Sequence, residues 1–265
     1  MIHKVRKTSA RYEMPSSSLT GKAILITGGG SGIGRATALK LAKLGARLAI
    51  TDIDLGSAAD TYQLCGGDPH YSGVMDVSSK DDVVLRVSEV VATFGRLDHV
   101  FNCAGINPTS YPLTDTTDEY WDQLINVNLK GTYLVTRATI PHITTPSGSY
   151  VNVSSICGLY PQAEQAIYCA TKHGVIGFSK SMALELGPKG VRTNVVAPGY
   201  IDTPTNSGVV KGGEYVTHME EGNSLGRLGT PEEIADVVVF LMSEEAKYMN
   251  GSVVEIHAGL KMLQC

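Results

Sequence analysis

The feature that most constrains the fold of this chain is a regular alternation of short apolar runs with longer stretches of helical periodicity. Seven runs have the length and composition of buried strands: residues 23–27, 47–52, 70–75, 98–102, 149–153, 191–197 and 252–256. Helical patterns lie between them, as at 78–94 and 166–186. Repeated strand–helix units build parallel sheets, so the sequence predicts an α/β fold with one doubly wound sheet of about seven strands and helices on both faces.

A single domain is expected over residues 19–265, because no linker marks a second one. The 43% hydrophobic and 18% charged content is typical of a globular enzyme. Residues 1–18 differ, since they are basic, carry several serines and lack a convincing apolar face. We expect this segment to be a flexible N-terminal arm, with a mitochondrial presequence as the alternative.

Charge and cysteine content exclude several classes of partner. The net charge of −4 and the pI near 6.0 argue against nucleic acid or an anionic membrane as the main partner. No apolar run approaches the ~18 residues of a membrane span. The five cysteines are odd in number and show no C-x-x-C spacing, which predicts free thiols in a reducing compartment, the cytoplasm, and no metal site.

A glycine-rich turn at 28–34 follows the first strand and leads directly into a helical pattern. Backbone amides at the start of a helix can approach a pyrophosphate where glycines leave no Cβ in the way. Asp52 ends the second strand, about 20 residues further on, where a carboxylate accepts hydrogen bonds from an adenosine ribose and repels a 2′-phosphate. The expected cofactor is therefore NAD rather than NADP. Arg35 is the rival signal, and a solvent-facing helix arginine is its simpler interpretation.

Two further strand ends carry groups suited to the same ligand. Asp76 and Val77 follow the third strand, where an adenine ring could lie, although Asp76 can also cap the helix that begins near Ser78. Asn102 ends the fourth strand, and the small residues 103–105 after it let a flat ring pass close to the backbone.

Asn128 lies inside a helical pattern that covers residues 121–128. Asparagine is a poor helix former because its side chain competes for backbone hydrogen bonds, so an internal one suggests a local reason. A surface or capping amide is the alternative interpretation.

A serine, a tyrosine and a lysine are arranged for acid–base chemistry. Tyr168 and Lys172 are four residues apart in the helical pattern 166–186, so their side chains lie on one face. An unperturbed phenol has a pKa of about 10, and a nearby ammonium favours its ionised form, so Lys172 is expected to lower the pKa of Tyr168. Ser155, after the strand 149–153, could hydrogen-bond a substrate oxygen. Taken alone, Tyr168 and Lys172 are more simply interpreted as an ordinary amphipathic pair.

Together these residues resemble the short-chain dehydrogenase/reductase family over nearly the whole chain, from about Leu19 to Gly259. The resemblance rests on T-G-G-G-S-G-I-G at 27–34, N-C-A-G at 102–105, Asn128, the set Ser155, Tyr168 and Lys172, and P-G at 198–199. The family has a Rossmann fold and includes NAD-preferring members. The chain departs from the family pattern at Cys103, where a second asparagine is usual, at His257-Ala258, where Asp-Gly is usual, and before Leu19, where the family has no counterpart.

The resemblance implies a role for each matching residue. Tyr168 would be the general acid/base, and Ser155 would position and polarise the substrate oxygen. Lys172 would lower the tyrosine pKa and hold the nicotinamide ribose, and Asn128 would support a water-mediated proton relay. The implied cofactor-binding set is Gly28, Ser31, Gly32, Ile33, Gly34, Asp52, Ile53, Asp76, Val77, Asn102, Ala104, Gly105, Tyr168, Lys172, Pro198, Gly199, Ile201 and Thr203. Family members are commonly tetramers, so a homo-oligomer, tetramer or dimer, is expected.

We therefore expect a cytoplasmic NAD-dependent oxidoreductase, a ketoreductase that transfers hydride between nicotinamide and a secondary alcohol or ketone. The residues predicted to wall its pocket mix apolar and amide groups without an arginine: Ile106, Asn107, Pro108, Ile156, Cys157, Tyr160, Gln162 and the segment 205–223. This mixture favours a small lipophilic or cyclic substrate, such as a steroid, terpenoid or polyketide intermediate of secondary metabolism. The Gly-rich, polar stretch around 203–229 is expected to be a mobile substrate lid.

Two alternatives remain open at this point. One is an isomerase or dehydratase that retains NAD without net redox. The other is a non-catalytic NAD-sensing binding protein.

Overall fold

The computed structural model describes residues 19–107, 109–204 and 213–260, and contains one sheet of seven parallel strands in the order β3-β2-β1-β4-β5-β6-β7. The strands are β1 (Ala23–Thr27), β2 (Arg47–Asp52), β3 (Tyr71–Val74), β4 (His99–Asn102), β5 (Ser149–Val153), β6 (Arg192–Pro198) and β7 (Val253–Ile256). The predicted doubly wound α/β fold is thus confirmed. The predicted arm at 1–18 lies outside the described residues.

The strand order reverses between β1 and β4. The chain first builds outward from β1 through β2 to β3, and then crosses back to place β4 on the other side of β1. The paired residues Thr27 and Thr51, and Thr27 and Asn102, bring the carboxyl ends of these strands to the same level. In an open α/β sheet, ligands bind in the crevice at such a reversal.

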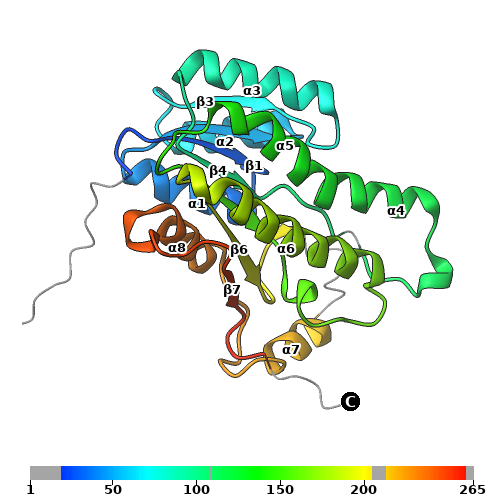
Figure 1. Ribbon diagram of the computed structural model, residues 1–265. Helices are drawn as coiled ribbons and strands as arrows, with labels where there is room; N and C mark the ends of the chain where they lie inside the picture. The colour runs from blue at the N-terminus through cyan, green and yellow to red at the C-terminus, as the bar shows by residue number, and fades with distance from the viewer. Residues whose placement is uncertain (1–18, 108, 205–212, 261–265) are drawn as a thin grey trace, which may run out of the picture.

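Helices cover both faces of the sheet (Figure 1). One face carries α1 (Gly32–Lys43), α2 (Leu55–Leu64) and α8 (Pro231–Met242), and the other carries α3 (Lys80–Phe94), α4 (Asp118–Leu124), α5 (Gly131–Thr139) and α6 (Ala166–Leu186). Side chains alternate along β1 between these two layers. Ile24 and Ile26 pack with the α1 and α8 side, while Ala23 and Leu25 pack with the α3 and α5 side. Both faces are buried, which explains why β1 is apolar up to its last residue, Thr27.

The observed bounds of α6 and α8 agree with those expected from the sequence. Thr230 caps α8 as expected, since its hydroxyl accepts from the Glu233 N–H at 3.3 Å and the Glu233 carboxylate accepts from the Thr230 N–H at 2.9 Å. The helix α2 and the helix α5 were not anticipated. The pattern at 121–128 proves to be part of a longer helical stretch, in which a π-helical segment, Ile125–Lys130, joins α4 to α5.

The sequence suggested a mobile lid without regular structure around 203–229, but this stretch includes a helix. It contains α7 (Gly213–Glu221), which Figure 1 shows apart from the two helix layers, and residues 205–212 lie outside the described part of the chain. Asn223 is buried, and its Oδ1 accepts from the N–H groups of Leu225 and Gly226 at 3.0 Å each. Buried amide contacts therefore order the end of this stretch, while its action as a lid stays a prediction.

In the described part of the chain, none of the helices combines the length and the apolar character that crossing a bilayer requires.

Candidate active site

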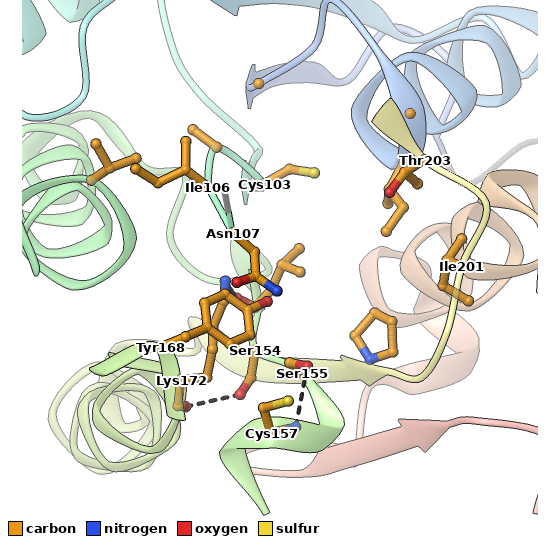
Figure 2. A pocket seen from close by; sticks show the side chains of 18 of the residues that line it. Cys103, Ile106, Asn107, Ser154, Ser155, Cys157, Tyr168, Lys172, Ile201 and Thr203 are labelled. Atoms are coloured by element: carbon orange, nitrogen blue, oxygen red, sulfur yellow. Dashed lines mark hydrogen bonds between the residues drawn. The ribbon is translucent and has the colours of Figure 1, made fainter. Parts of the chain in front are cut away.

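A pocket of about 560 Å³ opens at the carboxyl ends of the strands, at the reversal between β1 and β4. One wall comes from the glycine turn and the ends of β2 and β3. The opposite wall comes from the ends of β5 and β6 and from α6 (Figure 2). The pocket therefore joins residues from nearly every strand end, as ligand sites of open α/β sheets do.

The glycine turn after β1 is shaped by close backbone packing. Gly28 has φ of +65°, and a Cβ built on it would lie 2.8 Å from the Ala104 Cα. A Cβ on Gly34 would overlap the carbonyl oxygen of Gly28. Side chains at these positions would push the turn away from the pocket, so glycine is needed for the N-terminus of α1 to face it. Thr27 adds to this arrangement, because its Oγ1 accepts from the N–H groups of Cys103 and Ala104 at 3.2 Å each.

Asp52 lies at the pocket and binds the glycine turn directly. Its Oδ2 accepts from the Gly30 N–H at 2.9 Å. Arg35 is held elsewhere, since its Nε donates to Thr61 Oγ1 at 2.9 Å and its guanidinium reaches the Ser57 carbonyl at 3.4 Å. Contacts with α2 thus account for Arg35, which does not line the pocket.

The adjoining wall offers a flat apolar surface beside a fixed carboxylate. Ile53 lines the pocket while exposing 66% of its surface. Asp76 also lines it, and its Oδ1 accepts from the Ser78 N–H at 2.9 Å and the Ser78 hydroxyl at 2.7 Å. Asp76 therefore both stabilises the turn before α3 and faces the pocket.

Ser155 lies two residues after the end of β5 in extended conformation and lines the pocket. Its Oγ accepts from the Cys157 N–H at 3.2 Å, which leaves its own hydrogen to bond Tyr168 or a substrate oxygen. The neighbouring Ser154 has a different task, because its hydroxyl donates to the Lys172 carbonyl at 2.8 Å and so joins β5 to α6 (Figure 2).

Tyr168 and Lys172 lie on one face of α6, as their spacing predicted, and both line the pocket. The ammonium Nζ lies 5.5 Å from the centre of the Tyr168 ring and donates to the Val153 carbonyl at 3.1 Å. It contacts the face of the ring rather than the phenol oxygen.

In this arrangement burial opposes the acidification of Tyr168 that Lys172 is expected to cause. Burial raises the pKa of Tyr168 above its ordinary value, and only the hydrogen bond to Ser155 opposes this rise appreciably. Burial also lowers the pKa of Lys172 to about 8. The phenol is therefore protonated at neutral pH.

Asn128 lies just behind these residues in the π-helical segment. Its Oδ1 accepts from the Ile106 N–H at 2.8 Å, and its Nδ2 donates to the Ile106 carbonyl at 2.9 Å. A Cβ built on Gly105 would come within 3.3 Å of the Asn128 Oδ1 and 3.4 Å of the Lys172 Nζ, so the amide and the ammonium lie near the same backbone atom. The internal asparagine thus has the local reason that the sequence suggested.

Most of the residues expected to bind cofactor or substrate meet in this one pocket. It is lined by Gly28, Ser31, Gly32, Ile33, Asp52, Ile53, Asp76, Val77, Ala104, Gly105, Pro198, Gly199, Ile201 and Thr203, together with Ser155, Tyr168 and Lys172. Gly34, Asn102 and Asn128 do not line it. Asn102 instead is buried and donates to the Asn152 Oδ1 at 2.8 Å, within the sheet.

Of the expected wall, the pocket contains Ile106, Asn107, Ile156, Cys157 and Gln162, but not Tyr160, whose hydroxyl donates to Glu255 at 2.9 Å. Pro108 and residues 205–212 lie outside the described part of the chain. Met219, from the expected segment 205–223, lines the pocket, whereas sequence reasoning missed Tyr200 and Gln165, which also line it. Gln165 had a detectable signal, because it occupies the N-cap position of α6, where Ser, Thr, Asp or Asn is preferred.

Comparisons with known proteins agree with this geometry. The family model described as enoyl-(acyl carrier protein) reductase matches residues 28–261. The 3-oxoacyl-[acyl-carrier-protein] reductase FabG of Thermotoga maritima is 40% identical over 248 residues, which cover 91% of this chain and 98% of that protein. The human (3R)-3-hydroxyacyl-CoA dehydrogenase is 40% identical over 250 residues, which cover 90% of this chain and 95% of that protein.

Among solved structures, a 3-ketoacyl-(acyl-carrier-protein) reductase from Brucella melitensis, complexed with NADH, is 31% identical. It superposes with a TM-score of 0.85, covering 91% of this chain and 99% of that chain. This similarity extends over nearly the whole chain, including the residues that line the pocket.

Proposed function

The chain belongs to the short-chain dehydrogenase/reductase family of oxidoreductases, and from this premise we propose that it transfers hydride between NAD(H) and the carbon of a secondary alcohol or ketone. The observation that carries the proposal is the meeting of Ser155, Tyr168 and Lys172 in the wall of one pocket whose other wall is the glycine turn. A hydrogen-bonding hydroxyl, a proton donor and a cation are thereby available to one substrate oxygen.

The residues of the pocket fit a dinucleotide. The glycines at 28 and 34 leave backbone amides open to a pyrophosphate, Asp52 could accept from a ribose diol, and the exposed face of Ile53 suits an adenine. NAD is favoured over NADP because Asp52 faces the pocket while Arg35 is engaged by α2. When bound, the nicotinamide would supply or accept the hydride.

In reduction, Tyr168 would donate its phenolic proton to the carbonyl oxygen, and Ser155 would donate a hydrogen bond to the same oxygen. The protonated phenol of the structure is the form that this direction needs. In oxidation Tyr168 would take the proton as a phenolate, and the ammonium of Lys172 beneath the ring would favour that ionised state. Asn128 supports this arrangement by holding the backbone at Ile106, and its part in a water-mediated relay remains an expectation.

The proposal is tested by following NADH absorbance with a panel of substrates. The panel should include 3-oxoacyl thioesters, which the names of the relatives suggest, and cyclic ketones and alcohols, which the mixed apolar and amide wall suggests. Net change in NADH supports a dehydrogenase. Product without such a change would favour an isomerase or dehydratase, and binding of NAD with neither would favour a sensor.

We also propose that the protein forms a homo-oligomer. Several large apolar side chains are exposed on α4, α5 and α6, namely Trp121, Tyr133 and Leu184. Light scattering coupled to size-exclusion chromatography would test this, and a monomer at micromolar concentration would contradict it.

A further inference from the structure

Two buried amides in the pocket each have an oxygen without a hydrogen-bond partner. Asn107 is 8% exposed and Gln165 is 5% exposed, and both residues line the pocket together with Tyr168. Among the described residues, nothing hydrogen-bonds the Asn107 Oδ1 or the Gln165 Oε1. Leaving a buried acceptor unpaired is unfavourable, so a pair of them in one site indicates a partner that arrives with the ligand.

The two amides are held in position by contacts between the loops that carry them. The Gln165 Nε2 donates to the Ser110 Oγ at 2.5 Å, and the Tyr111 N–H donates to the Glu164 carbonyl at 3.0 Å. The loop that follows β4 is therefore joined to the loop that precedes α6. Figure 2 shows the amide of Asn107 pointing into the pocket on the side of Tyr168. Gln165, three residues before Tyr168, lines the same pocket, so we assign both amides to its substrate half.

The charges of the pocket favour a neutral partner for these oxygens. Lys172 is the sole cation among the described residues that line it, and its Nζ is turned to the Val153 carbonyl. A carboxylate or phosphate bound here would lie against two amide oxygens, which repel it, and would have no cation beside it to balance its charge. The lining carboxylates, Asp52 and Asp76, come from the opposite wall, so an ammonium would lack a counterion.

A hydroxyl satisfies the site better than an N–H group. Rotation of either amide by 180° exchanges its oxygen and nitrogen, and would leave an N–H group unpaired instead of an oxygen. A hydroxyl donates and accepts, so it can pair with either orientation.

We propose that the substrate carries a hydroxyl group close to its reacting carbon, and that Asn107 and Gln165 bind this hydroxyl. The inference rests on the proposed function and narrows its substrates to diols and hydroxyketones. It adds a second polar group to the lipophilic or cyclic substrate that the sequence led us to expect.

The test compares matched substrates that differ in one hydroxyl. Cyclohexane-1,2-diol and cyclohexane-1,3-diol are compared with cyclohexanol, with NAD as the oxidant and kcat/KM as the readout. We expect the better diol to exceed cyclohexanol about 10- to 100-fold, because the simpler alcohol leaves the amides unpaired. The variants Asn107→Leu and Gln165→Met, similar in size but unable to form the bond, should reduce this ratio to about 1–3-fold.

The matched control is Gln63→Leu, which removes an exposed amide from α2 and should preserve the ratio. Thermal melting and titration of NADH by fluorescence show that each variant is folded and binds the cofactor. Equal kcat/KM for the diols and for cyclohexanol in the wild type, or a ratio unchanged in both pocket variants, would overturn the inference.

A second readout separates this inference from the proposed function. The shift in melting temperature that each alcohol produces in the presence of NADH reports binding without turnover. A larger shift for the diols, lost in the two pocket variants, supports the inference even if no NADH forms, in which case the proposed function alone fails. Equal shifts overturn the inference whatever the activity.

A final comparison tests the other neutral donor, an amide N–H. Acetoacetyl-N-acetylcysteamine carries such a group in its thioester arm, and the S-ethyl thioester of acetoacetate does not. The readout is again kcat/KM. If the thioester with the amide N–H is preferred, if Gln165→Met abolishes this preference, and if the diols show no advantage over cyclohexanol, the assignment to a hydroxyl is overturned.

Discussion

At the scale of single residues, the pocket holds a protonated phenol above a buried ammonium. The two groups share one cause, since burial disfavours the charged form of each: it raises the pKa of Tyr168 and lowers that of Lys172 to about 8. Proton donation by Tyr168 therefore needs no prior ionisation. Proton removal from an alcohol requires Tyr168 to ionise first. This ionisation depends on the positive charge of Lys172, which the lysine retains below its pKa of about 8.

Replacing Tyr168 by phenylalanine tests the proton transfer. Tyr168→Phe removes the hydroxyl and keeps the ring over Lys172, so kcat/KM should fall about 10²–10⁴-fold while NADH binding persists. Steady-state kinetics and fluorescence titration measure the two effects. Tyr160→Phe, which removes a hydroxyl outside the pocket, is the control. Activity of Tyr168→Phe within tenfold of the wild type would contradict the role.

Replacing Asp52 by alanine tests the choice of cofactor. Asp52→Ala removes the carboxylate at the end of β2, and its loss should weaken NAD binding about 5- to 100-fold while improving the relative affinity for NADP. Calorimetric titration with both dinucleotides gives the ratio. Asp60→Ala, which removes an exposed carboxylate of α2, should leave it unchanged. Tighter binding of NADP than of NAD by the wild type would refute the assignment.

At the scale of elements, the π-helical segment Ile125–Lys130 explains the asparagine within a helical pattern. The widened turn lets Asn128 form two hydrogen bonds with the backbone of Ile106, and so joins the α4–α5 stretch to the loop after β4. That loop also carries Asn107. The same contact therefore stabilises the helix and positions a wall of the pocket.

Removing this contact should affect stability and activity together. Asn128→Ala leaves the N–H and carbonyl groups of Ile106 without their partner, so the free energy of unfolding should fall by about 1–3 kcal/mol and kcat/KM should fall as well. Urea denaturation and kinetics provide the two numbers. Asn126→Ala is the matched control, because Asn126 lies on the same turn and its Oδ1 accepts from the Lys130 Nζ at 3.1 Å rather than from the backbone of Ile106. Equal effects of the two substitutions would disprove this function of Asn128.

At the scale of the whole molecule, buried polar side chains cross the sheet and fix how its layers meet. Asn102 of β4 donates to Asn152 of β5, which donates to Ser179 of α6, each at 2.8 Å. This chain of bonds links the strand ends to the helix that carries Tyr168. Asn102 therefore contributes to the site through the framework rather than by lining the pocket.

His99 makes the stability of this framework depend on pH. It is buried in β4, its Nδ1 lies 2.8 Å from the Ser149 Oγ, and burial lowers its pKa from 6.5 to about 3. Between these values the unfolded chain binds a proton that the folded protein does not, so stability is lost as pH falls from 6.5 towards 3. The loss should reach at most about 1.4 kcal/mol per pH unit for this one group.

Urea denaturation between pH 7 and pH 4 measures this dependence. The slope for His99→Gln should be smaller than for the wild type, whereas His142→Gln, which changes an exposed histidine, should leave the slope as it was. Identical slopes for His99→Gln and the wild type would show that burial of His99 does not couple folding to protons.

Local patterns in the sequence predicted much of the framework, because each depends on neighbours in the chain. The apolar runs became the seven strands, and Thr230 with Glu233 set the start of α8. The region around 55–64 was harder, since α2 buries only Ala58 and Thr61 and so has little apolar periodicity. The helix within 203–229 was hidden by glycines and polar residues.

The sequence by itself determined the sheet, the glycine turn and the shared face of Tyr168 and Lys172, because these follow from periodicity and from spacing along one element. Only the tertiary structure decided the protonation of that pair and the unpaired oxygens of Asn107 and Gln165. Burial and hydrogen bonding depend on which distant segments surround a side chain. Since the loop after β4 and the loop before α6 meet only in the folded chain, no local pattern could reveal what they leave unsatisfied.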